Sequence, residues 1–163
     1  MAQVVEFTFE SLPKNLGELM SLPEVDLSTP FKTAALTVLV LMRYAESPED
    51  TIAMLDFLNG PREISGYEKQ FLRDRLREKD YVPRSYLKGT NPQNDYTPSL
   101  PYQISVSDQV YSYVNEGYVK LFITSSGADT PRPIVLRQKD DKWFMWEQFL
   151  LPDIRKPASK SDW

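Results

Sequence analysis

The sequence predicts an α+β fold, with N-terminal helices packed on one face of a C-terminal antiparallel β-sheet. Capped helical segments occupy residues 12–80, and alternating strand patterns with turn signals occupy residues 81–152. Helices followed by strands are typical of a domain whose helices gather on one side of an antiparallel sheet. We expect residues 1–163 to form a single domain with a polar tail at 153–163, and strong curvature of the sheet is left open.

Helix signals are strongest in three segments. Thr29 and Pro30 start the first, and residues 34–42 are apolar on nearly every side, which is typical of a buried helix. A buried strand is the alternative there, because several residues are β-branched. Ser47 and Ser65 provide the same type of capping start for two further helices, and Asn59-Gly60-Pro61 is a stop signal between them. A shorter helical turn is expected around residues 16–20.

Period-two alternation predicts the strands. It occurs at residues 5–9 and 102–106, and again at 110–114 and 118–124, where Asn115-Glu116-Gly117 predicts a hairpin turn. Within residues 133–151, two runs of strand-forming residues flank the charged break Asp140-Asp141-Lys142, which predicts a second hairpin. Residues 81–100 read as a long ordered loop with one short strand at 85–88.

Composition excludes several chemistries. The sequence contains no histidine and no cysteine, which removes Ser-His-Asp and Cys-His catalysis, Cys-ligated metals and the usual zinc sites. The net charge of −4 argues against a nucleic-acid surface. No cofactor motif, metal motif or long apolar span is present, so we expect a cytoplasmic protein without membrane contact, cofactor or metal.

Residues 84–96 form the best candidate ligand loop. Their side chains offer charge, flat aromatic surface and directed hydrogen bonds, although Asn and Asp also stabilise turns through their own backbone. A structural turn is therefore the alternative. The candidate binding residues in this loop are Arg84, Tyr86, Lys88, Asn91, Asn94, Asp95 and Tyr96. Arg132 is a further candidate, with an ion pair to Asp129 as its structural role.

Trp143 and Trp146 complete the candidate binding residues. Side chains alternate along a strand, so these two residues are expected on opposite faces of the sheet. One then belongs to the core. The other either is covered by the 81–100 loop or the tail, or forms the centre of a binding surface. Trp163 is interpreted as a docking residue or as part of a disordered end.

The strings SYLKG, NPQNDYTPSLPYQISV, GYVKLFITSSGADTPRPIVLR and KWFMWEQFLLPDIRKP, with a terminal Asp-Trp, carry a family resemblance. The C-terminal half resembles an uncharacterised bacterial domain family of unknown function. The resemblance implies a bacterial single-domain protein. It implies no activity, cofactor or catalytic residue.

The leading functional hypothesis is a non-enzymatic interaction or ligand-binding module that uses an aromatic sheet face and the 84–96 loop. A protein partner, a small polar ligand and a homodimer all remain open. The alternative is a histidine-free enzyme with carboxylate acid/base chemistry, such as a glycosidase-like hydrolase, built from acid pairs. The acid pairs are Glu49/Asp50, Asp140/Asp141 and Asp108/Glu116.

Overall fold

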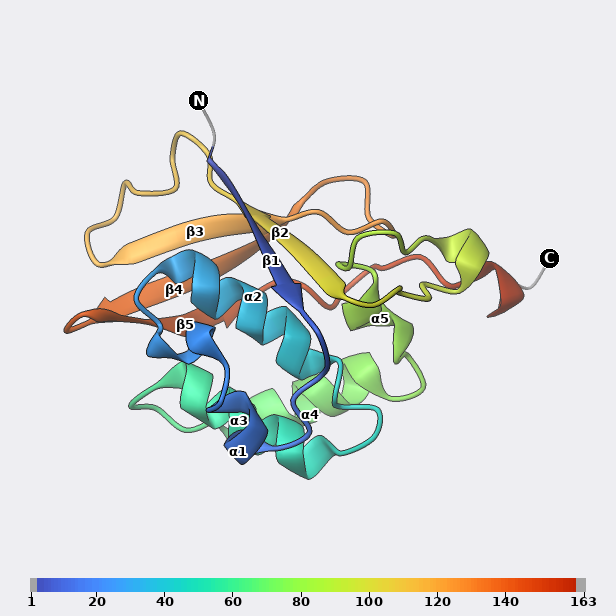
Figure 1. Cartoon of the computed structure of the whole chain (residues 1–163), viewed down its shortest axis with the longest axis horizontal. Coiled ribbons are helices and arrows are strands. Elements are labelled where there is room, and N and C mark those ends of the chain that lie inside the picture. The colour runs from blue at the N-terminus through green and yellow to red at the C-terminus, as the bar shows by residue number, and fades with distance from the viewer. Residues whose placement is uncertain (1–2, 161–163) are drawn as a thin grey trace.

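The fold is an open five-stranded antiparallel sheet with helices beside it, which confirms the predicted α+β class (Figure 1). The structure is a computed structural model that describes residues 3–160. The strands, in sheet order, are β1 (Val4–Phe9), β2 (Tyr102–Ser107), β3 (Tyr118–Ile123), β4 (Arg132–Lys139) and β5 (Lys142–Gln148). The helices are α1 (Leu16–Leu19), α2 (Pro30–Leu41), α3 (Pro48–Asn59), α4 (Gly66–Leu76) and α5 (Tyr81–Arg84), with 3-10 turns η1 (Pro23–Asp26), η2 (Pro92–Asn94) and η3 (Ala158–Lys160).

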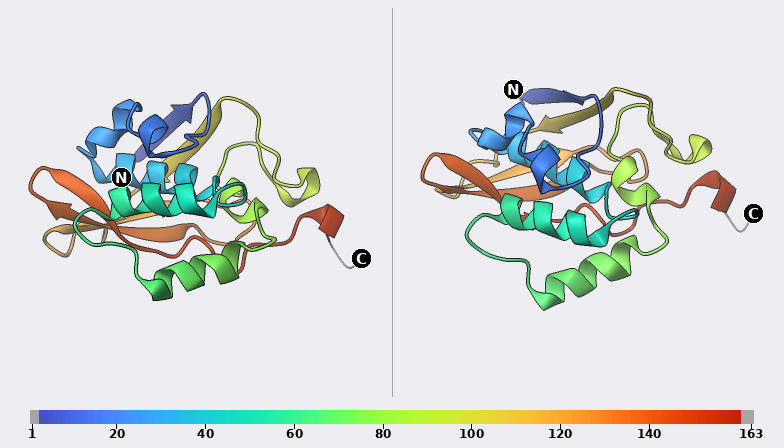
Figure 2. Two further views of the ribbon diagram at one scale, coloured as in Figure 1. Left: turned by 90° about the horizontal axis from the view of Figure 1, so that it is seen from below. Right: turned by 60° about the horizontal axis from the view of Figure 1, so that its bottom comes forward.

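Helix α2 lies at the centre of the core. All its residues except Lys32 are buried, because the helix contacts β2, β3, β4 and β5 on one side and α3 on another. Helix α3 also contacts β5, and α1 contacts α3, so the helices gather on one side of the sheet (Figure 2). The apolar run at 34–42 is therefore a buried helix, and the buried-strand alternative is wrong.

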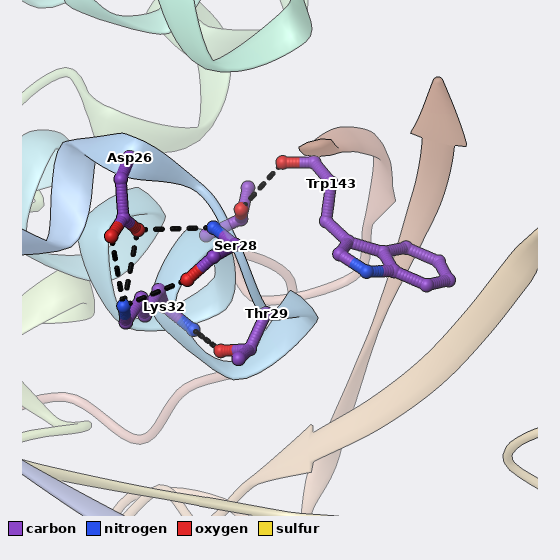
Figure 3. Close-up of polar contacts among 6 residues, drawn as sticks. Asp26, Ser28, Thr29, Lys32 and Trp143 are labelled. Carbon is purple, nitrogen blue, oxygen red and sulfur yellow. Dashed lines mark hydrogen bonds and ion pairs between the residues drawn. The ribbon is translucent and has the colours of Figure 1, made fainter. Parts of the chain in front are cut away.

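Each long helix begins at its predicted cap. The side chains of Thr29, Ser47 and Ser65 accept hydrogen bonds from the backbone N–H groups three residues later. Figure 3 shows the first of these caps beside an ion pair in which Lys32 Nζ lies 3.1 Å from an oxygen of Asp26. The N–H of Ser28 and then Lys32 lower the pKa of the Asp26 carboxyl.

The hairpin of β4 and β5 is confirmed, and it contains a β-bulge that alternation did not predict. Leu136 pairs with Met145, but its neighbour Val135 pairs with Glu147, so Trp146 is an extra residue in β5. Met145 is buried, whereas Trp146 and Glu147 both lie away from the core side. A bulge of this kind locally re-aims side chains and disrupts the ladder.

Two strand predictions are wrong. Residues 110–114 form an irregular loop, because the β2–β3 pairing stops at Ser107 and Phe122. Their alternation has no face to bury: the exposed fraction of the side chain is 84% for Val110 and 79% for Tyr111. Residues 85–88 form turns after α5 instead of a strand, although the N–H of Lys88 donates to the carbonyl of Gln103 at the edge of β2.

The segment after β5 packs on the body of the protein, although its composition is polar. Ile154 and Pro157 are buried, and the N–H of Arg155 donates to the carbonyl of Gly127. Ser159 donates its hydroxyl to Asp95, so the segment lies along the 84–96 loop. The proposed role of Trp163 falls outside the described residues.

Candidate functional site

The polar side chains of the 84–96 loop are engaged within the protein. Arg84 donates to the carbonyl oxygens of Tyr96 (2.9 Å) and Asp95 (3.0 Å) and forms an ion pair with Asp80 at 3.1 Å. Its guanidinium therefore holds the ends of the loop together. This is the structural turn that the sequence left open as the alternative to binding.

The two loop tyrosines are core residues. The Tyr86 hydroxyl donates to the carbonyl of Leu150, and the Tyr96 hydroxyl donates to the carbonyl of Arg155 at 2.7 Å. Burial raises the pKa of both phenols. Because both rings are buried and both hydroxyls are hydrogen-bonded, neither aromatic ring offers a surface to a ligand.

The remaining loop residues are placed in the same way. Asn91 and Asn94 form a reciprocal capping box around η2, and Asp95 accepts from Ser159. Lys88 is exposed and borders a small polar hollow with Ser85 and Thr90. Among the seven candidates in this loop, Lys88 has the side chain that forms no hydrogen bond or ion pair with other described residues.

Arg132 does not pair with Asp129, so that prediction is wrong. Its guanidinium donates to the carbonyl oxygens of Pro152 (2.6 Å) and Asp153 (3.2 Å), while Asp129 pairs with Arg155. Arg155 therefore takes the partner that was predicted for Arg132, because the C-terminal segment lies against the start of β4. Arg132 serves to hold that segment.

Trp143 lies on the core side of the hairpin. It pairs with Gln138, in phase with the buried Leu136 and Met145, and its ring packs against the core. The backbone N–H of Trp143 donates to the carbonyl of Leu27, and the backbone carbonyl of Trp143 accepts from the Thr33 hydroxyl at 2.6 Å. Figure 3 shows the indole directed away from the Asp26–Lys32 pair. These bonds join the outer edge of β5 to the start of α2.

Trp146 lies on the opposite side, between two cations. The guanidinium of Arg62 lies 4.6 Å from the centre of the indole, and that of Arg137 lies 4.9 Å from it. Tyr118 meets the indole edge to face at 5.9 Å. Arg62 also donates to the carbonyl of Trp146. Residues from the α3–α4 loop, β3, β4 and β5 therefore converge on one ring.

A cavity of about 520 Å³ adjoins this ring, between α4 and β5. Its walls are mainly apolar and come from the side chains of Leu41, Leu55, Ile64, Tyr67, Phe71, Leu72, Met145, Trp146, Phe149 and Pro152. Three charged side chains also line it: Arg62, Glu68 and Glu147. Arg62 and Glu68 lie 3.4 Å apart, so this pair closes one part of the rim.

A smaller cavity of about 270 Å³ shares Arg62, Met145 and Trp146 with the first. Asn59, the last residue of α3, lines it and is 2% exposed. Neither the amide nitrogen nor the amide oxygen of Asn59 has a hydrogen-bond partner in the described chain. Buried polar groups without a partner are rare, because each costs free energy of desolvation.

Carboxylate chemistry receives little support from the pKa shifts. In the described part of the chain, the carboxyl groups with a clearly shifted pKa are Asp26 and Asp108, and both are lowered. The Tyr113 hydroxyl and then the N–H of Gln3 hold Asp108 ionised. Burial and Asp108 raise the pKa of Tyr113 to about 12. These bonds anchor the 108–117 loop, so Asp108 has a structural role.

No cluster of three or more acidic side chains within residues 3–160 is arranged to hold a metal ion. In the same range, no helix has the length and apolarity needed to cross a bilayer.

Comparison with known protein families identifies the family of this chain. A family model described as Domain of unknown function (DUF6935) matches residues 11–158. The chain belongs to this family. The match covers the α-helices and strands β2 to β5, so the likeness extends beyond the C-terminal strings that carried the resemblance. No curated protein and no solved structure matches the chain.

Sequence reasoning missed Asn59 and Arg62. Asn59 was part of a helix stop signal, and Arg62 stood in an ordinary polar connection. The available signal was the stop itself: Gly60 has a φ of +73°, and its missing side chain lets Phe144 approach closely, where a Cβ would lie 2.5 Å from the ring. This contact brings the α3–α4 loop against β5.

Proposed function

We propose that this DUF6935 chain is a non-enzymatic ligand-binding module whose site is the apolar cavity between α4 and β5. The observation that carries the proposal is the cavity of about 520 Å³ with Trp146 and Arg62 at its edge. Ligand sites are usually concave, mainly apolar and provided with few polar groups, and they commonly measure about 300–1,000 Å³. The proposal moves the site from the exposed sheet face and the 84–96 loop to this cavity.

The placement of the aromatic side chains supports this move. On the solvent side of the sheet, Tyr118 and Phe122 are half-buried and contact cations. The strongly exposed aromatic residues lie elsewhere, including Tyr67 on α4 with 81% of its side chain exposed. Tyr67 also lines the cavity, so it is placed to cover an apolar ligand.

The test is titration with a neutral apolar dye, N-phenyl-1-naphthylamine, whose fluorescence rises in an apolar environment. We expect saturable binding that quenches Trp146. Tyr67→Ala and Phe149→Ala, which shorten the cavity wall, should weaken binding severalfold. Tyr111→Ala is the matched control, because Tyr111 is similarly exposed but lies in the β2–β3 loop. Absence of saturable binding would overturn the proposal.

The second candidate is a hydrolase that uses carboxylates. Glu68 and Glu147 both line the cavity, which is the observation in its favour. Glu68 is already paired with Arg62, however, which weakens its suitability as a general acid. Hydrolysis of nitrophenyl glycosides that is lost in both Glu68→Gln and Glu147→Gln would support the hydrolase. Equal background hydrolysis in all three proteins would eliminate it.

A further inference from the structure

The smaller cavity beside Trp146 differs from the larger one in its charge. Arg62, Arg137 and Lys139 line it, and its lining contains no acidic side chain. The larger cavity contains Glu68 and Glu147 with Arg62. The two cavities together therefore have an apolar part and a cationic part, joined at Met145 and Trp146.

Two of the cations have donors that the described residues leave unused. The guanidinium of Arg137 faces the rings of Trp146 and Tyr118, but it forms no hydrogen bond or ion pair with residues 3–160. The Nε of Arg62 is buried and has no acceptor within the described residues. Guanidinium groups bind oxyanions through parallel N–H donors, and such charge-assisted bonds are strong.

Asn59 adds a second requirement. Its buried amide offers N–H donors at Nδ2 and an acceptor at Oδ1, and both lack partners. The dianion of a phosphate monoester provides acceptors alone and would leave Oδ1 unpaired. A carboxylate next to an N–H satisfies both atoms. This combination occurs in an N-acyl amino acid and at the C-terminus of a peptide, where an amide N–H lies next to a free α-carboxylate.

We propose that the smaller cavity is a carboxylate subsite for N-acyl amino acids, with the apolar side chain of the ligand in the larger cavity. Arg137 and Arg62 bind the carboxylate, and Asn59 accepts from the ligand N–H and donates to the carboxylate. Lys139 adds long-range attraction. This subsite rests on the proposed function, because the larger cavity must hold the apolar side chain.

The test uses isothermal titration calorimetry to compare two probes of nearly the same size: N-acetylphenylalanine, which ends in a carboxylate, and N-acetylphenylalaninamide, which ends in a neutral carboxamide. We expect the carboxylate probe to bind at least about tenfold more tightly than the amide probe. Arg137→Gln should remove most of this difference. Arg73→Gln, an exposed α4 arginine outside both cavities, is the matched control and should retain it.

Asn59→Leu tests the amide without removing a hydrogen bond within the described residues. We expect the variant to remain folded and to bind the carboxylate probe severalfold more weakly. If it binds the probe as well as the parent protein, the assignment of Asn59 is wrong. Gly-Gly-Phe distinguishes the source of the ligand: tighter binding than N-acetylphenylalanine indicates a peptide C-terminus, and weaker binding indicates a free N-acyl amino acid.

Failure of this subsite is distinguishable from failure of the binding module. Equal affinities for the acid and the amide, with dye binding intact, would overturn the carboxylate subsite alone. Tighter binding of inorganic phosphate than of the acid would also overturn it. Loss of dye binding would remove the module and the subsite together.

Discussion

The 84–96 loop and the cavity beside Trp146 contain the same kinds of side chain, yet they differ in where their hydrogen bonds go. In the loop, Arg84 and Tyr96 donate to backbone carbonyls. In the cavity, the Asn59 amide and the Arg62 Nε have no partner in the described chain. Residue type alone would rank the loop above the cavity. Their hydrogen bonds reverse the order. A polar group that is already hydrogen-bonded stabilises the fold, whereas one without a partner is free to bind a ligand.

The largest expected effect is on the loop side of this comparison. Tyr96→Ala removes a fully buried ring stacked on Tyr81, together with a hydroxyl bonded to the carbonyl of Arg155. We expect the free energy of unfolding to fall by about 4 kcal/mol. Urea denaturation measures it, and Tyr111→Ala should change it by less than about 0.5 kcal/mol. Similar losses in both variants would contradict a core role for Tyr96.

Asn59→Leu should have the opposite sign. It replaces an amide that is buried without partners by an apolar side chain of similar size. We expect an increase of about 2 kcal/mol in the free energy of unfolding, because the desolvation penalty of the amide is removed. Asn94→Leu is the matched control and should lose stability, because the Asn94 Oδ1 accepts from the N–H groups of Asn91 and Thr97 and its Nδ2 donates to the carbonyl of Gly89. Destabilisation by Asn59→Leu would show that the amide is satisfied in solution.

Asp108→Asn tests the hydrogen bonds that hold the 108–117 loop. The carboxylate accepts from Tyr113 at 2.6 Å and from the N–H of Gln3 at 2.7 Å, so neutralising it should cost about 1.5 kcal/mol at pH 7. The lowered pKa gives the sign of the pH dependence. The stabilisation is present above the unfolded pKa of 3.8 and is lost as pH falls through the folded value.

Thermal unfolding between pH 2 and pH 7 measures this effect. The difference between Asp108→Asn and the parent protein should shrink below pH 4 as the parental carboxyl becomes protonated. Asp141→Asn, which neutralises an exposed turn carboxylate, is the control for the loss of one negative charge and should leave the midpoint of thermal unfolding at pH 7 nearly unchanged. A constant difference across the range would exclude the charge of Asp108 as the cause.

The smallest expected effect is Asn91→Ala, which removes one half of the capping box around η2. We expect a loss of about 1 kcal/mol in the free energy of unfolding. Gln93→Ala, in the same turn and exposed, should be nearly neutral. Weaker binding of N-acetylphenylalanine in Asn91→Ala, with stability unchanged, would return the site to the loop.

Most of the fold follows from local patterns in the sequence. The caps at Thr29, Ser47 and Ser65 and the apolar run of α2 predict the helices, because capping and burial leave periodic signals within a few residues. The β4–β5 hairpin is equally local. The predicted strand at 110–114 had alternation without a face to bury, whereas residues 85–87 are buried but form turns after α5. Whether such a face exists depends on contacts between distant segments.

The candidate site was harder to predict for the same reason. Trp146 was correctly separated from Trp143, because alternation is a property of one strand. Its partners Arg62 and Arg137 come from a helical connection and a neighbouring strand, which no spacing in the sequence joins. The unpartnered state of Asn59 is a property of three-dimensional packing. A sequence displays donors and acceptors, but it does not display which of them are already occupied.

The bulge in β5 leaves Trp146 without a paired residue in β4. Leu136 still meets Met145, and Val135 still meets Glu147, as they would in a strand one residue shorter. Trp146 is therefore an extra residue at which the register of the β4–β5 ladder shifts by one. We therefore expect a substitution at position 146 to change the lining of both cavities while the residue pairs on either side of the bulge are kept.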